Sequence, residues 1–284
     1  MRGAANQVPA YRIKHREIES PAELQSLIKC FWYTSIDFSK DQSCFEVMPD
    51  GYAEIIFYFG SACSIKREGQ LQLLPSPFIM GLLNQPVILH ADSRIEVVGI
   101  RCFPWTLSNV LGLPAVLNGP RVFQHPIAQL QQALSEFVRV ARVNDALALL
   151  KEYFLHGRSS IATDNILLKA GRAMRNAGGT LPVSDIAGQA HATVRTLQRK
   201  FKQSSGHTVK DVTALMRFEQ VRNRLWFYPK SNLAALAHEL GYTDQSHLSK
   251  EFKRYSGSTP AAFARKAKDR QFLSDNDFVA FIQA

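Results

Sequence analysis

Two short segments near the C-terminal end carry side chains suited to reading nucleic-acid bases. The expected base-reading residues are Arg195, Thr196, Gln198 and Arg199 in the first segment and Gln245, Ser246, Ser249 and Lys250 in the second. Arg pairs bidentately with guanine edges and Gln with adenine edges in the major groove. Hydroxyl and ammonium groups suit phosphate oxygens, so we expect backbone contacts from Thr193, Lys202, Thr243 and Lys253. The chemistry predicted here is recognition of double-stranded DNA.

The two segments belong to an internal repeat. Residues 197–208 read LQRKFKQSSGHT and residues 248–259 read LSKEFKRYSGST, so six of twelve positions coincide at a period of 51 residues. Upstream, Ile186-Ala187 is matched by Leu236-Ala237. Self-similarity at such a distance indicates two copies of one supersecondary unit.

Each copy predicts a short helix, a tight turn and a second helix. In the first copy, residues 183–206, Thr193 is a good N-cap and Gly206 a good helix terminator. The helix between them is expected to bury Val194, Leu197 and Phe201. This arrangement, with a basic and amide-rich outer face, is typical of a helix-turn-helix unit.

The second copy, residues 233–257, follows the same plan. Asn232 is expected to cap its first helix, Gly241 to form the turn, and Thr243 or Asp244 to cap a helix that buries Leu248 and Phe252. An amphipathic helix over residues 209–228 would separate the two units rigidly. Recognition helices about 34 Å apart would enter successive major grooves on one face of the duplex.

Charge is distributed unevenly along the chain. Residues 1–159 hold 15 basic and 14 acidic residues, whereas residues 160–284 hold 19 and 10. A nearly neutral half joined to a strongly basic half indicates that the basic half meets a polyanion. Charge alone also suits an anionic membrane surface, and the repeat favours DNA.

The N-terminal half predicts short strands followed by helices. Apolar runs at residues 53–59, 78–83, 86–90 and 95–103 are separated by turn signals, which favours a sandwich or small barrel. Residues 105–112 predict a short helix. Helical spacing over 125–156 predicts one long helical region or two helices broken near residues 143–145, before a linker at 157–160.

This half shows no pattern of a catalytic or metal site. The cysteines Cys30, Cys44, Cys63 and Cys102 form no C-x-x-C pair and are expected to be reduced and mostly buried, with a thiol sensor as the alternative. We expect no catalytic residue, no metal and no cofactor. If a cavity exists, it suits an organic effector. The strand residues expected to line that cavity are Met48, Ile56, Tyr58, Phe78 and Ile88.

The start of the chain has no apolar run behind Arg2, and no apolar segment is long enough to cross a bilayer. The expected location is therefore the cytoplasm, without membrane attachment.

Residues 241–260, GYTDQSHLSKEFKRYSGSTP, resemble the signature of the AraC/XylS family of bacterial transcription regulators. The first copy resembles that family's first helix-turn-helix through Leu197-Gln198-Arg199, Phe201-Lys202 and Gly206. The resemblance covers about residues 165–267 and implies seven helices, the first over 161–176. The family usually has Gly in the first turn, where this chain has His191, and His reaches the left-handed conformation at an energetic cost.

The N-terminal half resembles the cupin-like sensor domains of the same family, through residues 48–51 (MPDG) and 97–104 (VVGIRCFP). The implied fold is α+β with two domains. Residues 1–120 would form a cupin-like barrel or sandwich that binds an effector, and 121–160 a helical linker that supports dimerisation. Residues 161–270 would form an all-α DNA-binding domain, and 271–284 a C-terminal extension.

Three hypotheses follow. The first is a regulator whose effector changes the packing of the 125–156 helices and thereby its action at DNA. Operator DNA, a small effector, RNA polymerase and a second copy of the chain are its expected partners. The second is a DNA-binding regulator whose N-terminal domain is only structural or dimerising. The third, an enzyme, lacks a clustered nucleophile and base.

Overall fold

The N-terminal domain is built on antiparallel strands, as the alternating apolar runs predict. In the computed structural model, residues 12–271 are described except 39–43, 68, 114, 116–118, 158–160 and 162–163. One sheet has six strands in the order β1-β2-β9-β4-β7-β10. Their bounds are β1 Arg12–Glu19, β2 Ile28–Asp37, β9 Ile95–Cys102, β4 Ala53–Gly60, β7 Phe78–Met80 and β10 Pro120–Arg121.

A second sheet of four strands faces the first. Its order is β3-β8-β5-β6, with β3 Cys44–Val47, β8 Val87–His90, β5 Ser64–Arg67 and β6 Gln70–Leu73. Trp32, Ile56 and Phe78 from the larger sheet share one buried core with Phe45 and Leu89 from the smaller. Both sheets are open in the described part of the chain, so of the two expected architectures the sandwich is found rather than a closed barrel.

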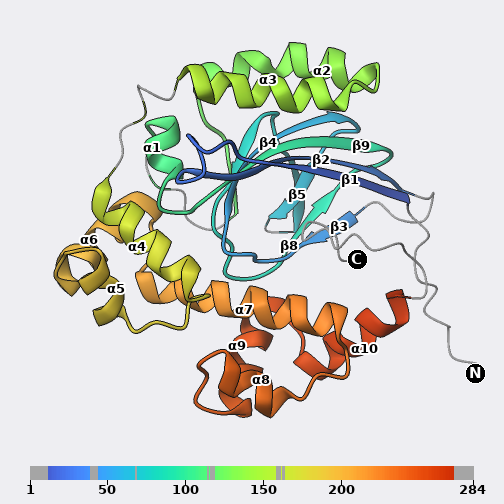
Figure 1. Ribbon diagram of the computed structural model, residues 1–284. Coiled ribbons are helices and arrows are strands. Elements are labelled where there is room, and N and C mark those ends of the chain that lie inside the picture. Colours follow the sequence, from blue (N-terminus) through green and yellow to red (C-terminus); the bar gives the residue numbers. More distant parts are fainter. Residues whose placement is uncertain are drawn as a thin grey trace, which may run out of the picture.

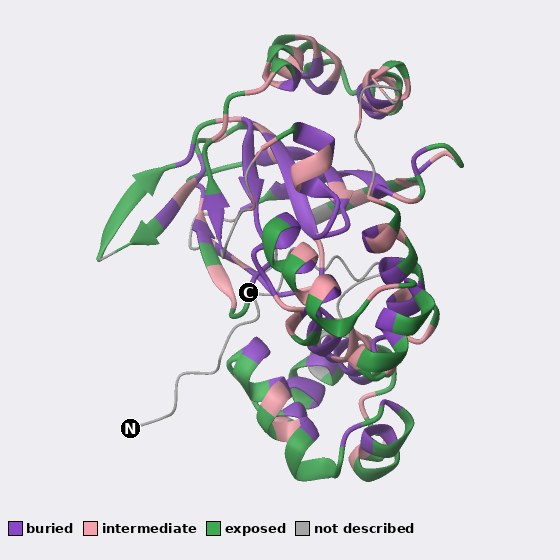
Figure 2. Ribbon diagram, turned by 90° about the vertical axis from the view of Figure 1, so that its left-hand side faces the viewer, coloured by how far each residue is buried: buried purple, intermediate pink, exposed green. Residues whose placement is uncertain are grey.

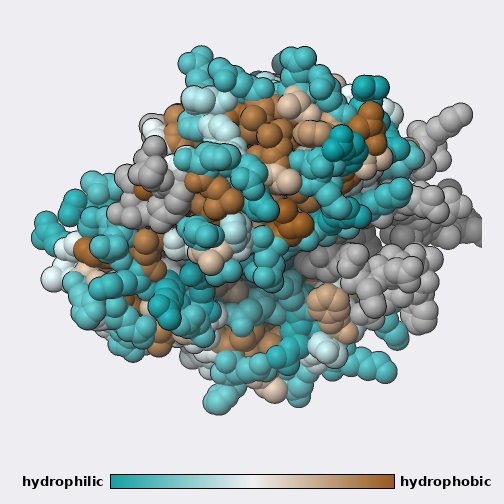
Figure 3. Space-filling model, turned by 45° about the horizontal axis from the view of Figure 1, so that its top comes forward, coloured by the Kyte–Doolittle hydropathy of each residue, from teal (hydrophilic) through white to brown (hydrophobic). Residues whose placement is uncertain are grey.

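Helices cover the other face of the six-stranded sheet. The short α1 is Leu107–Leu111, and the predicted 125–156 region forms a 3-10 turn at Pro126–Leu130, α2 Gln131–Arg139 and α3 Val143–His156. The break therefore falls at residues 140–142, slightly before the expected position. Leu134, Leu147 and Leu150 pack with Phe31 and Phe57 of the sheet, so α2 and α3 form a layer of the N-terminal domain. Figure 1 shows the two helices above the sheet, and Figure 3, with the top turned forward, shows hydrophobic side chains gathered among hydrophilic ones there.

The C-terminal part is helical, with seven helices in residues 164–271, as the resemblance implies. They are α4 Asn165–Asn176, α5 Val183–Gln189, α6 Val194–Ser205, α7 Val209–Phe227, α8 Leu233–Glu239, α9 Gln245–Ser256 and α10 Pro260–Gln271. The first begins four residues later than the expected 161, because Asp164 caps it by accepting hydrogen bonds from the amides of Ile166 and Leu167. Residues 158–160 of the expected linker and 272–284 of the expected extension lie outside the described residues.

The two parts share a core. Phe103 and Trp105, which follow β9, are buried with Met174, Phe201 and Leu215 of the helical domain. Trp105 stacks on Phe103 with ring centroids 5.2 Å apart and lies 5.8 Å from the ring of Phe201. Figure 2 shows buried residues both in the sheets and on the inner faces of the helices. The helical domain is therefore docked on the sheet domain through a buried aromatic cluster.

Candidate nucleic-acid interface

The first helix-turn-helix unit consists of α5, a turn and α6. Thr193 caps α6, since its hydroxyl accepts a hydrogen bond from the amide of Thr196 at 3.1 Å. The turn depends on His191, whose φ of 51° is in the left-handed region. Leu197 and Phe201 are fully buried, and Gly206 ends the helix with a φ of 74°. The expected cap, core pair and terminator of this unit are confirmed.

The second unit consists of α8, a turn and α9, and has the same kinds of cap, turn and core as the first, formed by different residues. Asn232 caps α8 by accepting from two amides, and Gly241 forms the turn with a φ of 70°. Asp244, rather than Thr243, caps α9 by accepting from the amide of His247 at 2.8 Å. Leu248 and Phe252 are buried as expected.

The repeat extends to a hydrogen-bond pattern after each recognition helix. Ser205 Oγ donates to the Phe201 carbonyl and accepts from the His207 amide. Ser256, 51 residues later, makes the same bonds with Phe252 and Ser258. The two units therefore share these side-chain hydrogen bonds as well as the order of their helices.

Most of the predicted contact residues lie on the exposed faces of α6 and α9. The exposed ones are Thr193, Arg195, Arg199, Lys202, Thr243, Gln245, Ser246, Lys250 and Lys253, and the half-buried ones are Thr196, Gln198 and Ser249. Several already have internal partners: the Thr193 and Thr196 hydroxyls bond to each other, and Arg199 donates to Gln203 Oε1 at 3.5 Å. Gln198 Oε1 accepts from the Val209 amide at 3.4 Å, and Lys202 Nζ donates to the Gly206 carbonyl at 2.7 Å. Their base and phosphate roles stay predictions.

One expectation about α6 is wrong. Val194 was expected in its core, but 44% of its surface is exposed. Its position explains this, because the core of the unit is formed by Leu197 and Phe201, further along the helix, together with Ile186 and Ala187 of α5.

The central helix α7 holds the two units apart. It begins with a capping box in which Thr208 and Asp211 bond to each other's amides. Its predicted apolar side is confirmed by the burial of Val212, Leu215, Phe218, Val221 and Leu225. Figure 1 shows α7 lying between the α5–α6 pair and the α8–α9 pair.

Ion pairs at equivalent repeat positions attach each recognition helix to a different partner. Lys200 of α6 pairs with Asp164, and Glu251 of α9 pairs with Arg217 of α7 at 3.4 Å. Burial acts to raise the pKa of Asp164, but the hydrogen bonds from Lys200 and from the amides that it caps outweigh burial and lower it. Each pair fixes the inner side of its helix and leaves the outer side free.

The residues expected to line an effector cavity mostly belong to packed cores. Ile56 and Phe78 lie between the sheets, with Tyr58 packed against them, and Met48 lies in the core shared with the helical domain. The expectation that Ile88 points inward is wrong, since 51% of its surface is exposed on the outer side of β8.

The cysteines fit the structural interpretation. Cys30, Cys63 and Cys102 are buried, Cys44 is half-buried, and none is in a disulfide. Burial raises the pKa of the Cys63 thiol to about 12 and raises those of Cys30 and Cys102 still further. Such thiols are protonated at neutral pH and poor nucleophiles. Among the described residues, no three His, Cys, Asp or Glu side chains gather as a metal site.

A cleft between the two domains is the feature that sequence reasoning missed. It has a volume of about 490 Å³ and is lined by Ser20, Lys29, Tyr52 and Phe103 from the sheet domain and by Arg175 and Glu219 from the helices. Arg175 lies 4.1 Å above the Phe103 ring. Neither Arg175 nor Lys29 forms an ion pair within the described residues, and the buried Ser20 hydroxyl has no partner there. No local sequence pattern could have revealed a site assembled from residues as far apart in the chain as Lys29 and Arg175, which are separated by 146 positions.

Charged groups from both domains gather next to this cleft. Arg101 pairs with Glu54 at 2.7 Å and with Asp50 at 3.4 Å. The buried Arg222 of α7 donates to the Pro49 carbonyl at 2.9 Å and lies 3.8 Å from Glu219. Burial outweighs the attraction of Arg222 and raises the pKa of Glu219 to about 7.

Comparisons with known proteins agree with the two-part organisation. Residues 167–266 match the family of helix-turn-helix domains, and residues 16–119 match a domain family of unknown function. Within the described residues, no helix is both long and apolar enough to cross a membrane.

Three similar proteins illustrate the match. The Msm operon regulatory protein of Streptococcus mutans is 27% identical over 92 residues, 32% of this chain and 33% of that protein. The HTH-type transcriptional activator RhaS of Pectobacterium carotovorum is 23% identical over 157 residues, 50% of this chain and 56% of that protein. The fatty-acid-bound structure of ToxT from Vibrio cholerae is 12% identical, with a TM-score of 0.47 over 93% of this chain and 97% of that one.

The matched segments thus span between a third and just over half of the length of these two curated relatives. The helix-turn-helix family match, residues 167–266, covers both units described above. Residues 167–266 therefore belong to a helix-turn-helix domain family, and this match and the similar regulators support the resemblance to AraC/XylS transcription regulators.

Proposed function

We propose that the protein is a sequence-specific DNA-binding transcription regulator that acts in the cytoplasm and is not an enzyme. The observation that carries the proposal is the pair of matching units, each with an exposed polar and basic outer face on its second helix. Helix α6 would present Arg195 and Arg199, and α9 would present Gln245 and Lys250, to bases in successive major grooves.

Selection from a pool of genomic DNA fragments at fixed salt tests this proposal. The wild type should select one motif with contacts in two successive major grooves. The double variant Arg199→Ala plus Gln245→Ala should lose that selectivity and keep weak, salt-sensitive binding. A matched control, Gln132→Ala plus Arg139→Ala, removes the same residue types from the exposed side of α2 and should select the wild-type motif. Equal, unselective binding by all three proteins would refute base reading.

The proposal includes control by a small effector, and we place its site in the interdomain cleft. Pockets for small molecules have volumes of about 300–1,000 Å³, and the cleft falls in this range. Each domain contributes a cation that forms no ion pair within the described residues, Lys29 from β2 and Arg175 from α4, so an anionic group would be attracted by both. A ligand that touches both domains can bind one arrangement of them more tightly than another, as allosteric control requires.

A thermal-shift panel of small carboxylates and phosphates tests the effector site. A binding compound should stabilise the wild type, and Arg175→Gln or Lys29→Gln should weaken that stabilisation. The exposed Lys169 of α4 lies outside the cleft, so Lys169→Gln should respond like the wild type. An absence of stabilisation across the panel would favour the alternative, in which the N-terminal domain is structural or dimerising.

RNA polymerase and a second copy of the chain complete the proposed set of partners. Sedimentation of the free protein and of its DNA complex would give the stoichiometry of the chain. Transcription from a template carrying the selected motif would show whether polymerase activity rises or falls.

A further inference from the structure

Val194 is an apolar side chain exposed where the first recognition helix begins. It is the first residue of α6 after the cap Thr193, and 44% of its surface is exposed. The next residue, Arg195, is exposed as well. Val194 therefore lies outside the core of the unit, on the part of the helix that a DNA duplex would meet first.

The internal repeat places Val194 at the position equivalent to Gln245 of the second unit. Val194 and Gln245 are 51 residues apart, the period of the repeat, and each follows the cap of its recognition helix, Thr193 or Asp244. Both side chains are exposed. Since Gln245 is among the residues proposed to read bases, the equivalent position in the first unit faces the same kind of surface.

The chemistry of the two side chains differs. An amide can exchange hydrogen bonds with an adenine edge, whereas an isopropyl group has no donor or acceptor. The apolar group that the major groove offers is the C5-methyl of thymine. We propose that Val194 reads a thymine methyl group in the half-site bound by α6. This inference rests on the proposed function and adds a specificity residue to it.

Removal of single methyl groups from the DNA tests the inference. The probe is the duplex selected by the wild type, synthesised with each thymine replaced in turn by uracil, which differs only in lacking the methyl. Wild-type affinity should fall about fourfold at one thymine of the first half-site, which corresponds to about 0.8 kcal/mol for one buried methyl group. Val194→Ala should bind the thymine duplex about fourfold more weakly and show no further loss with uracil at that position.

Two control variants separate this reading role from general effects. Val140→Ala changes an exposed valine at the end of α2 and should keep the full response to uracil. Gln245→Ala should weaken binding to the second half-site and keep the response in the first. Because Val194 is exposed, its alanine variant should melt like the wild type, and a melting scan checks this.

The outcomes distinguish this inference from the proposed function. If the wild type selects no motif, the proposed function fails and the inference fails with it. If the wild type selects a motif but tolerates uracil at every thymine, or if Val194→Ala keeps the wild-type response to uracil, only the assignment of Val194 is overturned.

Discussion

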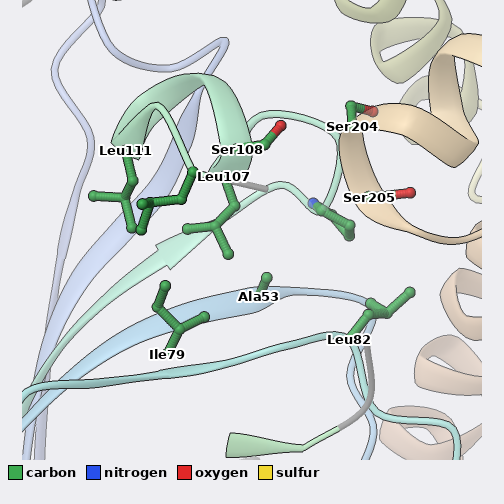
Figure 4. A pocket seen from close by; sticks show the side chains of 10 residues that line it. Ala53, Ile79, Leu82, Leu107, Ser108, Leu111, Ser204 and Ser205 are labelled. Atoms are coloured by element: carbon green, nitrogen blue, oxygen red, sulfur yellow. The ribbon is translucent and has the colours of Figure 1, made fainter. Parts of the chain in front are cut away.

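The two helix-turn-helix units have the same internal construction but different attachments to the rest of the molecule. The first is docked on the sheet domain, because α6 packs against α1 and Phe201 contacts the ring of Trp105. Figure 4 shows Ser204 and Ser205, at the end of α6, beside Leu107 and Ser108 of α1 around a cavity of about 10 Å³. In the described residues, the hydrogen bonds and ion pairs that α8 and α9 make outside their own unit run to α7.

Because their attachments differ, the two units should respond differently to a change in the sheet domain. A change in the sheet domain reaches α6 directly through α1 and Trp105. Among the described residues, it reaches the second unit through α7, which meets the sheet domain at the bond between Arg222 and the Pro49 carbonyl and through Leu215 in the shared core. We therefore expect perturbations of the interface to alter the first unit more than the second.

The largest effect is expected from Trp105→Ala. The side chain is fully buried and occupies the space that a Cβ at Gly171 would need, since that atom would lie 2.3 Å from the ring. Loss of a buried Trp costs about 3–5 kcal/mol of unfolding free energy. Urea unfolding should show this loss, and hydrogen exchange should rise more in α4 and α6 than in α9.

A second buried tryptophan supplies the control. Trp32 lies between the two sheets, so Trp32→Ala should raise exchange in the strands before it does so in α6. Equal exchange in α6 and α9 for Trp105→Ala would break the comparison, because it would mean that the docked and undocked units respond as one.

The next prediction concerns pH at the α7 contact. The pKa of Glu219 is raised to about 7, chiefly by burial, although 23% of its side chain is exposed. The folded state therefore holds a proton that the unfolded chain releases near its ordinary value of 4.5. The stabilising contribution is complete below that value and is lost as pH rises through about 7, so the protein should be less stable at pH 8 than at pH 6.

Urea midpoints at the two pH values would measure this effect, and Glu219→Gln should reduce the dependence. Part of it should remain, because burial also raises the pKa of Glu54, which faces Arg101. Asp50, Lys29 and Arg222 complete the charged surroundings of Glu219. An unchanged pH dependence in Glu219→Gln would show that another group is responsible.

A smaller effect should separate the ion pairs of the two units. Glu251 and Arg217 are mostly buried, with side chains 13% and 15% exposed, whereas Lys200 and Asp164 are about a quarter exposed. Glu251→Gln should therefore cost about 1.5–3 kcal/mol. The equivalent Lys200→Gln should cost less than about 1 kcal/mol. Chemical denaturation of both variants measures the difference, and equal costs would contradict the burial argument.

Much of the helical domain could be predicted from the sequence, because its signals are local. The caps at Thr193 and Asn232, the terminator Gly206 and the buried pair Leu197–Phe201 each depend on neighbours within one helix turn or two. The repeat provided an internal check, since the same pattern occurs twice. The burial of Val194 was predicted wrongly, because an apolar stripe on a helix does not show how far along that helix the neighbouring helix covers the stripe.

The cleft and the sheet pairing depend on distant contacts and were harder to predict. Arg175 and Lys29 are close only because α4 docks on the sheet domain through Trp105. Ile88 is apolar, but its strand belongs to the smaller sheet and its side chain is on the outer face. An apolar strand residue can face either side of a sheet, and without the pairing partners the choice is open.

The smallest predicted effects concern the two turns, which differ by one side chain. His191 and Gly241 both have a left-handed φ, of 51° and 70°. This conformation costs an L-residue roughly 1–2 kcal/mol relative to Gly. A Cβ at Gly241 would lie 3.6 Å from Thr180, an ordinary contact, so Gly241→Ala should lose about 1 kcal/mol through backbone strain alone.

The reciprocal change, His191→Gly, relieves the strain in the first turn but adds chain entropy to the unfolded state, so its gain should be less than about 1 kcal/mol. Thermal unfolding of both variants measures whether each change raises or lowers stability. Opposite signs would show that the turns are interchangeable and that His191 carries a small strain that the docking of the first unit tolerates. A loss of stability in His191→Gly would instead mean that the imidazole makes a contribution of its own, and the two turns would then differ in more than conformational freedom.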